Sequence, residues 1–180
     1  YQQLLNTNER RKNYLSIRDE VFSPGGIAFR SQSRWYSTQK SVNLMREFEV
    51  KNNFKFDFVL LSRFDLWYLR KFNLEKLDPK FIYAGPRTDG SPPEKPVLYE
   101  KDHEHALEDL WFLGGSDIIH NFGNLYENIL SYSLRPTWAS REHIKSSIGE
   151  EKLRYMWWSG HDYGLLRNYR YPEQGNPTIE

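Results

Sequence analysis

An apolar run that stops at a single carboxylate is the sequence feature that most limits how this chain folds. It lies in residues 56–69, FDFVLLSRFDLWYL, where Phe-Val-Leu-Leu at 58–61 follows the polar stretch KNNFKFD. Such a short apolar block predicts a strand buried on both faces of a sheet. Asp65 comes where this strand would end, and a carboxylate there is costly to desolvate without a cationic partner. Because ligands of open α/β sheets bind at the carboxyl ends of strands, Asp65 is the first candidate for chemistry.

The overall charge and the absence of cysteine exclude several functions. The 180 residues carry 25 Lys and Arg against 24 Asp and Glu, so no net field favours nucleic acid or an anionic membrane. Without cysteine the chain has no disulfide or thiolate metal site, which fits a reducing compartment. These 180 residues show neither the pattern expected of a signal peptide nor an apolar run of membrane length. These features predict a cytoplasmic protein of one domain.

Apolar spacing in the rest of the chain predicts a mixture of helices and strands. Residues 1–26 form a polar lead-in that ends at the breaker Ser-Pro-Gly-Gly, and residues 85–105 form a long loop rich in proline and charge. The elements expected around these segments are a short strand or extended segment at 27–29, a helix at 37–52 with Ser37 or Thr38 as its N-cap, strands at 81–84 and 107–113, a helix at 118–133 capped by Ser116 or Asp117, and a helix at about 141–156. Their order predicts an α/β fold with a mixed sheet flanked by helices.

A second carboxylate of interest, Asp109, lies in the apolar segment 107–113. We expect this segment to pack beside the strand that precedes Asp65. Alternation along a strand would place Glu108 and Asp109 on opposite faces, so only one of them would reach a site shared with Asp65. Two acidic strand ends would allow one carboxylate to hold a metal ion and the other to act as a base. An ion pair with arginine or a turn cap explains Asp109 equally well.

Candidate metal ligands other than these carboxylates are few. His103 and His105 lie in the long loop at a spacing that matches no standard zinc signature, and we interpret them as solvated side chains. A site for Mg²⁺ or Mn²⁺ made of oxygen ligands is the more natural possibility, because such ions are held by one or two carboxylates together with substrate phosphates.

Three arginines, Arg30, Arg34 and Arg63, lie before and within the region of the first strand. Arginine binds a diphosphate through bidentate hydrogen bonds, so each is a candidate ligand of a nucleotide. Arg63 comes two residues before Asp65, and a structural ion pair with that carboxylate is at least as well supported. The chain has no glycine-rich phosphate loop of the P-loop or dinucleotide-binding type.

Two segments of the chain resemble one group of enzymes. The stretch from Trp35 to Asp65 is similar to bacterial and viral GT-A type glycosyltransferases of capsule, lipopolysaccharide or glycan synthesis. In that group a helix with the sequence WYS precedes a strand that ends in Arg-x-Asp, a reduced form of the Asp-x-Asp metal motif. Here this motif reads Arg63-Phe64-Asp65. The downstream segment 109–129, DLWFLGGSDIIHNFGNLYENI, resembles the second conserved segment of the same group, in the same order.

The resemblance implies a GT-A fold, which is related to the Rossmann fold, and transfer of a sugar from a nucleotide-sugar donor to a hydroxyl of a glycan acceptor. It implies Mn²⁺ or Mg²⁺ on Asp65, with the late His161 as a further ligand. Asp109 would act as the base if the reaction inverts the anomeric centre. The remaining residues carried over are Arg30, Arg34 and Arg63 for the diphosphate, and Trp67, Tyr68 and Trp111 for stacking on sugar rings.

The chain departs from the group in two ways. Arg63 stands where Asp-x-Asp enzymes have their first aspartate, and the amino-terminal strand pattern that holds the nucleotide base is missing, so we expect that half to lie upstream of Tyr1. A non-catalytic carbohydrate-binding or scaffold module derived from a transferase is the alternative. A metal-dependent nuclease or phosphatase is disfavoured by the balanced charge, since we expect no nucleic-acid partner. Peripheral membrane association would come only through the acceptor.

Overall fold

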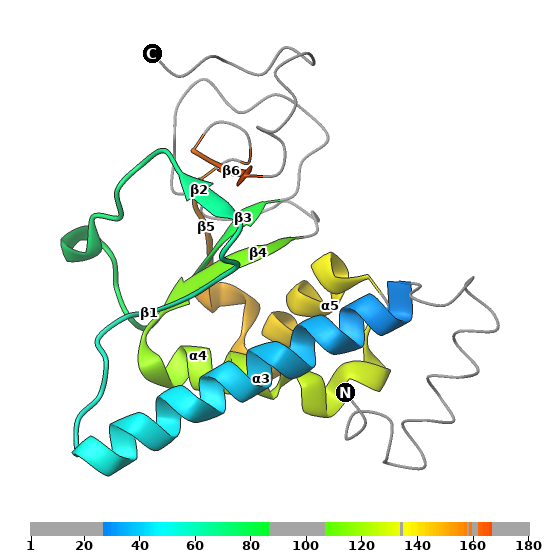
Figure 1. Cartoon of the computed structure of the whole chain (residues 1–180), viewed down its shortest axis with the longest axis horizontal. Helices are drawn as coiled ribbons and strands as arrows, with labels where there is room; N and C mark the ends of the chain where they lie inside the picture. Colours follow the sequence, from blue (N-terminus) through cyan, green and yellow to red (C-terminus); the bar gives the residue numbers. More distant parts are fainter. Residues whose placement is uncertain (1–26, 87–106, 134, 158, 160–161, 167–180) are drawn as a thin grey trace.

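The computed structural model describes residues 27–86, 107–133, 135–157, 159 and 162–166 (Figure 1). The described segments form three α-helices, several short helical turns and six strands. In chain order these are α3 (Ile27–Asn52), β1 (Val59–Ser62), β2 (Leu66–Tyr68), the 3₁₀ turn η1 (Leu74–Lys76), β3 (Ile82–Pro86), β4 (Leu107–Gly114), α4 (Ser116–Gly123), the 3₁₀ segment η2 (Asn124–Ser131), α5 (Pro136–His143), the π-helical turn η3 (Ile144–Ile148), the 3₁₀ turn η4 (Glu150–Lys152), β5 (Leu153–Tyr155) and β6 (Tyr163–Leu165).

The strands form two sheets. The larger sheet has the order β1-β4-β3-β5, in which β4 is antiparallel to both of its neighbours and β5 is parallel to β3. The smaller sheet is the antiparallel pair of β2 and β6. The expected mixed sheet is therefore present, and the segment 107–113 lies beside β1, as its apolar character predicts. None of the helices within the described segments is both long enough and apolar enough to cross a membrane.

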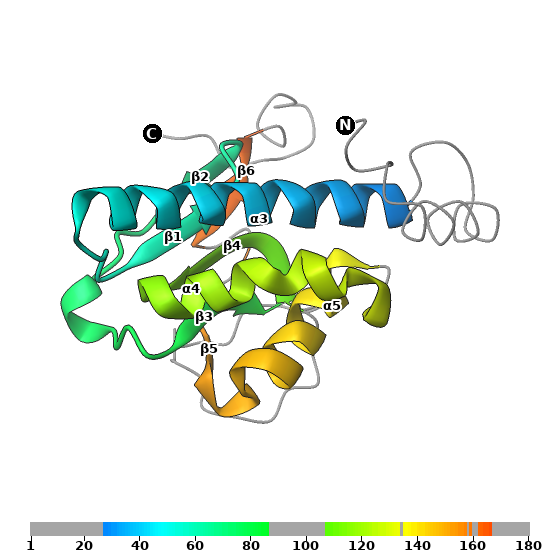
Figure 2. The same cartoon turned by 90° about the horizontal axis from the view of Figure 1, so that it is seen from below.

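The two faces of the larger sheet are covered by different kinds of element. Phe112 of β4 faces the layer of α3, α4 and α5, where its ring centroid lies 4.4 Å from that of Phe122 in α4 (Figures 1 and 2). The neighbouring residue of β4, Trp111, faces the opposite way, into an aromatic cluster that includes side chains of β2 and β6. Within the described residues, helices thus cover one face of the larger sheet and the β2–β6 pair covers the other.

Helix α3 begins at Ile27, ten residues before the expected start at Ser37. The short strand or extended segment expected at 27–29 is wrong, and Ser37 and Thr38 are not N-caps. Both hydroxyls instead donate to the carbonyl of the residue four positions earlier, at 2.9 and 3.1 Å, as serine and threonine do inside helices. Trp35 is completely buried and packs against Phe122. This tertiary contact stabilises the first turns of a helix that has little amphipathic pattern of its own.

Strand β1 lies at the edge of the larger sheet and none of its four residues is fully buried, so the prediction of a strand buried on both faces is wrong. Its only partner among the described residues is β4, and Leu60 at its centre is 39% exposed. An apolar run alone does not show whether a strand lies at the edge or at the centre of a sheet, because a strand in either position can have only one face covered.

The strands expected at 81–84 and 107–113 are confirmed as β3 and β4, with β3 extending through Gly85 and Pro86. The long loop therefore does not begin at residue 85, and its remaining part lies outside the described residues. The helix expected at 118–133 is confirmed only in its first part, as α4, because the 3₁₀ segment η2 replaces the α-helix from Asn124 to Ser131. The N-cap of α4 is Gly115, in an extended conformation. Asp117 instead pairs with Lys55 at 2.7 Å.

The helix expected at 141–156 is wrong in its second half. Helix α5 ends at His143, a π-helical turn continues to Ile148, and the chain then reverses into β5. Gly149 makes this change of direction with a φ of 108°, a conformation that a side chain disfavours. The three residues of β5 then pair with β3, and this long-range contact decides their conformation.

Candidate functional site

Most of the polar residues singled out in the sequence lie at one end of the strands of the larger sheet. We call this end of the sheet, formed by strand ends rather than by an outer strand, its edge. The carboxyl ends of β1 and β3 meet the amino end of β4 there, because Ser62 pairs with Trp111 and Pro86 pairs with Leu107. The turn that carries Arg63 and Asp65 follows β1 directly, as Figure 1 shows. The sheet therefore brings the Arg-x-Asp turn and the acidic pair of β4 to the same edge, where ligands of such sheets bind.

Strand β4 is irregular where it carries this acidic pair. Ala84 pairs with Phe112 and Pro86 pairs with Leu107, so two steps along β3 correspond to five steps along β4. Such a bulge re-aims side chains and is common beside active sites. The simple alternation expected for Glu108 and Asp109 therefore does not hold along this part of the strand.

Arg34 connects α3 to this bulge through hydrogen bonds. Its Nε and Nη2 donate to the backbone oxygen of Asp109 at 3.3 and 2.7 Å, and its Nη1 donates to the Thr38 hydroxyl at 3.0 Å. Burial lowers the pKa of Arg34, the Asp109 charge opposes this effect, and the nearby Arg63 reinforces it. Arg34 thus lies at the expected edge, with most of its donors used to hold the backbone of β4.

Arg63 and Asp65 form a bidentate ion pair. The Nε and Nη2 of Arg63 donate to the two carboxylate oxygens of Asp65 at 2.8 and 2.6 Å. The hydrogen bond to Asp65 raises the pKa of Arg63; burial opposes this effect, and the charges of Asp65 and Asp109 add to it. The expectation that Arg63 is a structural partner of Asp65 is confirmed, while its role toward a diphosphate stays a prediction.

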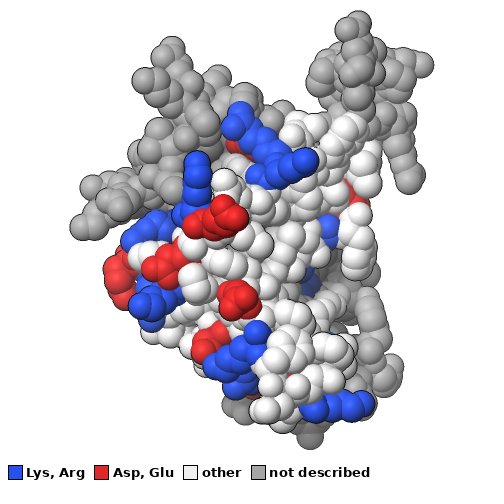
Figure 3. All heavy atoms as spheres, turned by 90° about the vertical axis from the view of Figure 1, so that its left-hand side faces the viewer, with Lys and Arg blue, Asp and Glu red and all other residues white. Residues whose placement is uncertain are grey.

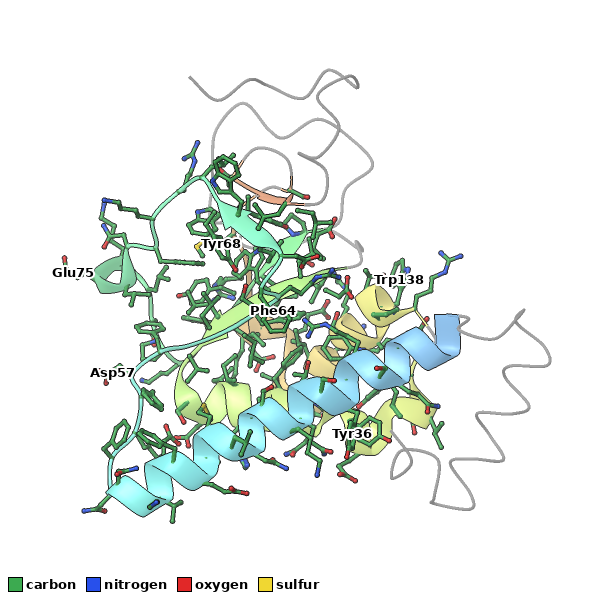
Figure 4. All side chains as sticks on the ribbon, viewed as in Figure 1. Tyr36, Asp57, Phe64, Tyr68, Glu75 and Trp138 are labelled. Carbon is green, nitrogen blue, oxygen red and sulfur yellow. The ribbon has the colours of Figure 1, made fainter. Side chains whose placement is uncertain are left out.

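Backbone hydrogen bonds fix the turn that carries this ion pair. The Arg63 N–H donates to the Leu110 oxygen at 3.2 Å, and the Leu166 N–H donates to the Asp65 oxygen at 2.8 Å. The turn is thereby tied to β4 on one side and to the end of β6 on the other. Between its two tied residues, the Phe64 side chain is fully exposed (Figure 4).

The aromatic residues expected to stack on sugars differ in accessibility. Trp111 is completely buried and packs edge-on against Tyr163, with ring centroids 5.9 Å apart, so it is a core residue. Trp67 and Tyr68 of β2 are half-buried. The Tyr68 hydroxyl lies 2.7 Å from the Ser62 hydroxyl, at the end of β1. Of the three, Trp67 and Tyr68 keep surface that a ligand can reach.

Two residues that sequence reasoning missed shape the neighbouring end of β3. Trp157 follows β5 with a φ of 65°, which is rare for a bulky side chain and marks a conformation held by its surroundings. Its ring packs on Phe72, with centroids 4.0 Å apart. A methyl group on Gly85 would collide with the buried hydroxyl of Tyr163. The sequence shows Gly85 only as a strand breaker and has no signal for the backbone of Trp157.

The described residues place three carboxylates at this edge, those of Asp65, Glu108 and Asp109, and the resemblance assigns the divalent metal ion to Asp65. They contain no group of three or more His, Cys, Asp or Glu side chains that could hold a metal. His161 lies outside the described residues, as do His103, His105 and the side chain of Arg30. One carboxylate is enough to hold Mg²⁺ or Mn²⁺ only where substrate phosphates and water molecules supply the other ligands of the ion. The ion would share the Asp65 oxygens with Arg63, since each oxygen can accept more than one contact.

A surface pocket of about 430 Å³ lies near the opposite end of α3, lined by Arg46, Glu49, Val50, Asn53, Phe54 and Lys55. Its acidic residue, Glu49, is buried and accepts hydrogen bonds from the Phe56 N–H at 2.9 Å and from Arg46 at 3.1 Å. Burial opposes the charge of Glu49, but these bonds and the nearby Ser116 hydroxyl outweigh it and lower the pKa. Glu49 holds the chain that leaves α3, so we assign the pocket no catalytic role.

Comparison of the chain with protein-family models, with curated protein sequences and with solved structures gives no match.

Proposed function

We propose that this chain is a glycosyltransferase with a GT-A-like fold, which moves a sugar from a nucleotide-sugar donor to a saccharide hydroxyl. One observation carries the proposal. The two sequence segments that resemble such enzymes contribute Asp65 and Asp109 to the same edge of the mixed sheet, and the helix of the first segment contributes Arg34. Residues far apart in sequence thus converge where a nucleotide would bind in an α/β sheet.

Each residue has a distinct role in this proposal. Arg63 binds Asp65 through its Nε and Nη2, and its Nη1 would donate further hydrogen bonds to the diphosphate. Asp109 would accept the proton of the attacking hydroxyl in an inverting reaction. Arg34 would position Asp109 through its backbone rather than contact the diphosphate itself. Trp67 and Tyr68 would contact sugar rings.

Asp65 would hold Mn²⁺ or Mg²⁺, and the ion would supply positive charge to the diphosphate leaving group. The Arg63 guanidinium already compensates the charge of the carboxylate and holds the Asp65 side chain in place. The charges on the face drawn in Figure 3 also favour a small ligand over nucleic acid, because basic and acidic side chains alternate there without a large area of one sign.

The first test is nucleotide binding. UDP, GDP and TDP are added to the protein with Mn²⁺, and the melting temperature is measured. We expect one nucleotide to raise it, EDTA to remove the rise, and Asp65→Ala to abolish it. Asp57→Ala is the matched control, since Asp57 is exposed on the segment before β1 (Figure 4). If no nucleotide changes the melting temperature of the wild-type protein, the transferase proposal is wrong.

The alternative, a carbohydrate-binding or scaffold module, is favoured by one observation. Both oxygens of Asp65 and most donors of Arg34 are satisfied within the chain, as in a site that needs no further ligand. This alternative predicts saccharide binding that is indifferent to Mn²⁺ and nucleotide.

A further inference from the structure

Phe64 is the most exposed large apolar side chain among the described residues. Its exposed fraction is 101%, and the next, Val50, reaches 70%. Single exposed apolar residues are common on protein surfaces, so exposure alone gives no function. The surroundings of Phe64 distinguish it from the other exposed residues.

The backbone on both sides of Phe64 is held rigidly. The Arg63–Asp65 ion pair bridges the residues before and after it, at 2.8 and 2.6 Å. The backbone of the same two residues is tied to Leu110 and Leu166. With its neighbours engaged on the protein side, the Phe64 ring projects outward from a turn that has little freedom to move. An aromatic ring presented in this way loses little entropy when a ligand stacks on it.

The ring is also next to the groups that the proposed reaction uses. Arg63 and Asp65 are its chain neighbours, and the Arg63 N–H bonds the residue that follows Asp109 in β4. The exposed aromatics at the other end of α3 differ, because Phe48, Phe54 and Phe56 pack on one another. Phe64 is thus an exposed ring located at the proposed reacting centre.

We propose that Phe64 is the platform on which a ring of the acceptor saccharide stacks. This inference rests on the proposed function. A pyranose offers a flat face of C–H groups that packs on an aromatic ring, while its hydroxyls stay available to polar groups such as Asp109. Asp109 must lie at the attacking hydroxyl, and the bond between Arg63 and Leu110 keeps β4 beside the turn of Phe64. This neighbourhood assigns Phe64 to the acceptor side of the site.

The test measures saccharide and nucleotide binding separately. Saturation-transfer NMR with methyl glycosides of glucose, galactose, mannose and N-acetylglucosamine reports saccharide binding, and the melting temperature with Mn²⁺ and UDP, GDP or TDP reports nucleotide binding. The variants are Phe64→Ala, Phe64→Tyr and, as matched control, Phe48→Ala. We expect Phe64→Ala to weaken saccharide binding about two- to tenfold, the scale of one ring contact. Phe64→Tyr and Phe48→Ala should bind as the wild type, and all three variants should keep the nucleotide response.

The other outcomes contradict either the stacking role of Phe64 or the proposed transferase function. Unchanged saccharide binding in Phe64→Ala, or no saccharide binding by the wild-type protein, overturns the platform. A loss of the nucleotide response in Phe64→Ala, with saccharide binding intact, assigns the ring to the donor base and also overturns it. Saccharide binding that depends on Phe64, together with no nucleotide response in the wild type, refutes the transferase and leaves the platform in a binding module.

Discussion

The guanidinium of Arg34 in α3 donates two hydrogen bonds to the backbone oxygen of Asp109 in β4, at 2.7 and 3.3 Å. The acceptor of both hydrogen bonds is the main-chain oxygen, so these bonds do not use the Asp109 carboxylate. The longest helix of the described fold is in this way connected to the bulge that carries the proposed base. Arg34 positions the strand, and the Asp109 carboxylate is the proposed base. A mutation of Arg34 can therefore test the first role, and a mutation of the Asp109 side chain can test the second.

Replacement of Arg34 by methionine should destabilise the fold. The change leaves the Asp109 carbonyl without its donors in a partly buried position, which costs about 1–3 kcal/mol of the free energy of unfolding. Arg34→Lys should recover only part of this loss, because an ammonium cannot reproduce the planar fork. Urea unfolding measures the effect. Lys40→Met, at an exposed position of the same helix, should stay within about 0.5 kcal/mol of the wild type.

Replacement of Asp109 by asparagine should affect transfer but not folding. The backbone oxygen that Arg34 binds is unchanged, so we expect the free energy of unfolding to shift by less than about 1 kcal/mol. Loss of a general base lowers the rate of an inverting reaction by about 10²–10⁴-fold. Product formation from a panel of nucleotide sugars, followed by mass spectrometry, measures this rate. A variant that transfers as fast as the wild type would show that Asp109 is not the base.

The sequence predicted those parts of the fold that local patterns encode. The strands β3 and β4 and the start of α4 follow from apolar runs bounded by glycine and proline. The pairing of β4 with β1 was also expected, and it brings Asp109 to the edge that carries Asp65. The ion pair of Arg63 with Asp65 was one of two readings that their spacing allowed.

The missed features depend on contacts between distant residues. Helix α3 begins early because Trp35 packs in the core, and β5 forms because β3 offers a parallel partner. The bulge in β4 has no local sign, since Glu108 and Asp109 fit a regular strand equally well. The burial of Trp111 and the exposure of Phe64 follow from which face of the structure is covered, and apolar character alone does not decide this.

Addition of a methyl group at Gly85 should destabilise the end of β3. The new Cβ would meet the Tyr163 hydroxyl, and the tyrosine is buried and has little room to move. We expect Gly85→Ala to cost about 1–3 kcal/mol, as overpacking commonly does. The double variant Gly85→Ala with Tyr163→Phe should recover much of this loss, because the colliding atom is gone. Thermal or urea unfolding of the two single variants and the double variant gives the coupling. Additive effects would contradict the proposed collision.

The buried imidazole of His143 should make stability fall as the pH is lowered. Its Nε2–H donates to the Asn121 oxygen and its Nδ1 accepts from the Tyr132 hydroxyl, both at 3.1 Å, which is the pattern of the neutral ring. Burial lowers the pKa of His143 below the ordinary histidine value of 6.5, and the hydrogen bond to Asn121 opposes this only in part. The unfolded chain therefore binds the proton more readily than the folded chain. The stabilisation is complete above pH 6.5 and is lost as the pH falls toward the lower folded pKa.

Urea unfolding between pH 8 and 5.5 tests this dependence on His143, in a range where most carboxylates stay ionised. The free energy of unfolding should decrease below about pH 6.5 in the wild-type protein. It should decrease less in His143→Gln, which has no group that titrates at this position. His120→Gln, in half-buried surroundings on α4, serves as the control and should keep the wild-type slope. A wild-type stability that rises on acidification, or an equal slope in His143→Gln, would show that the buried imidazole does not control the response.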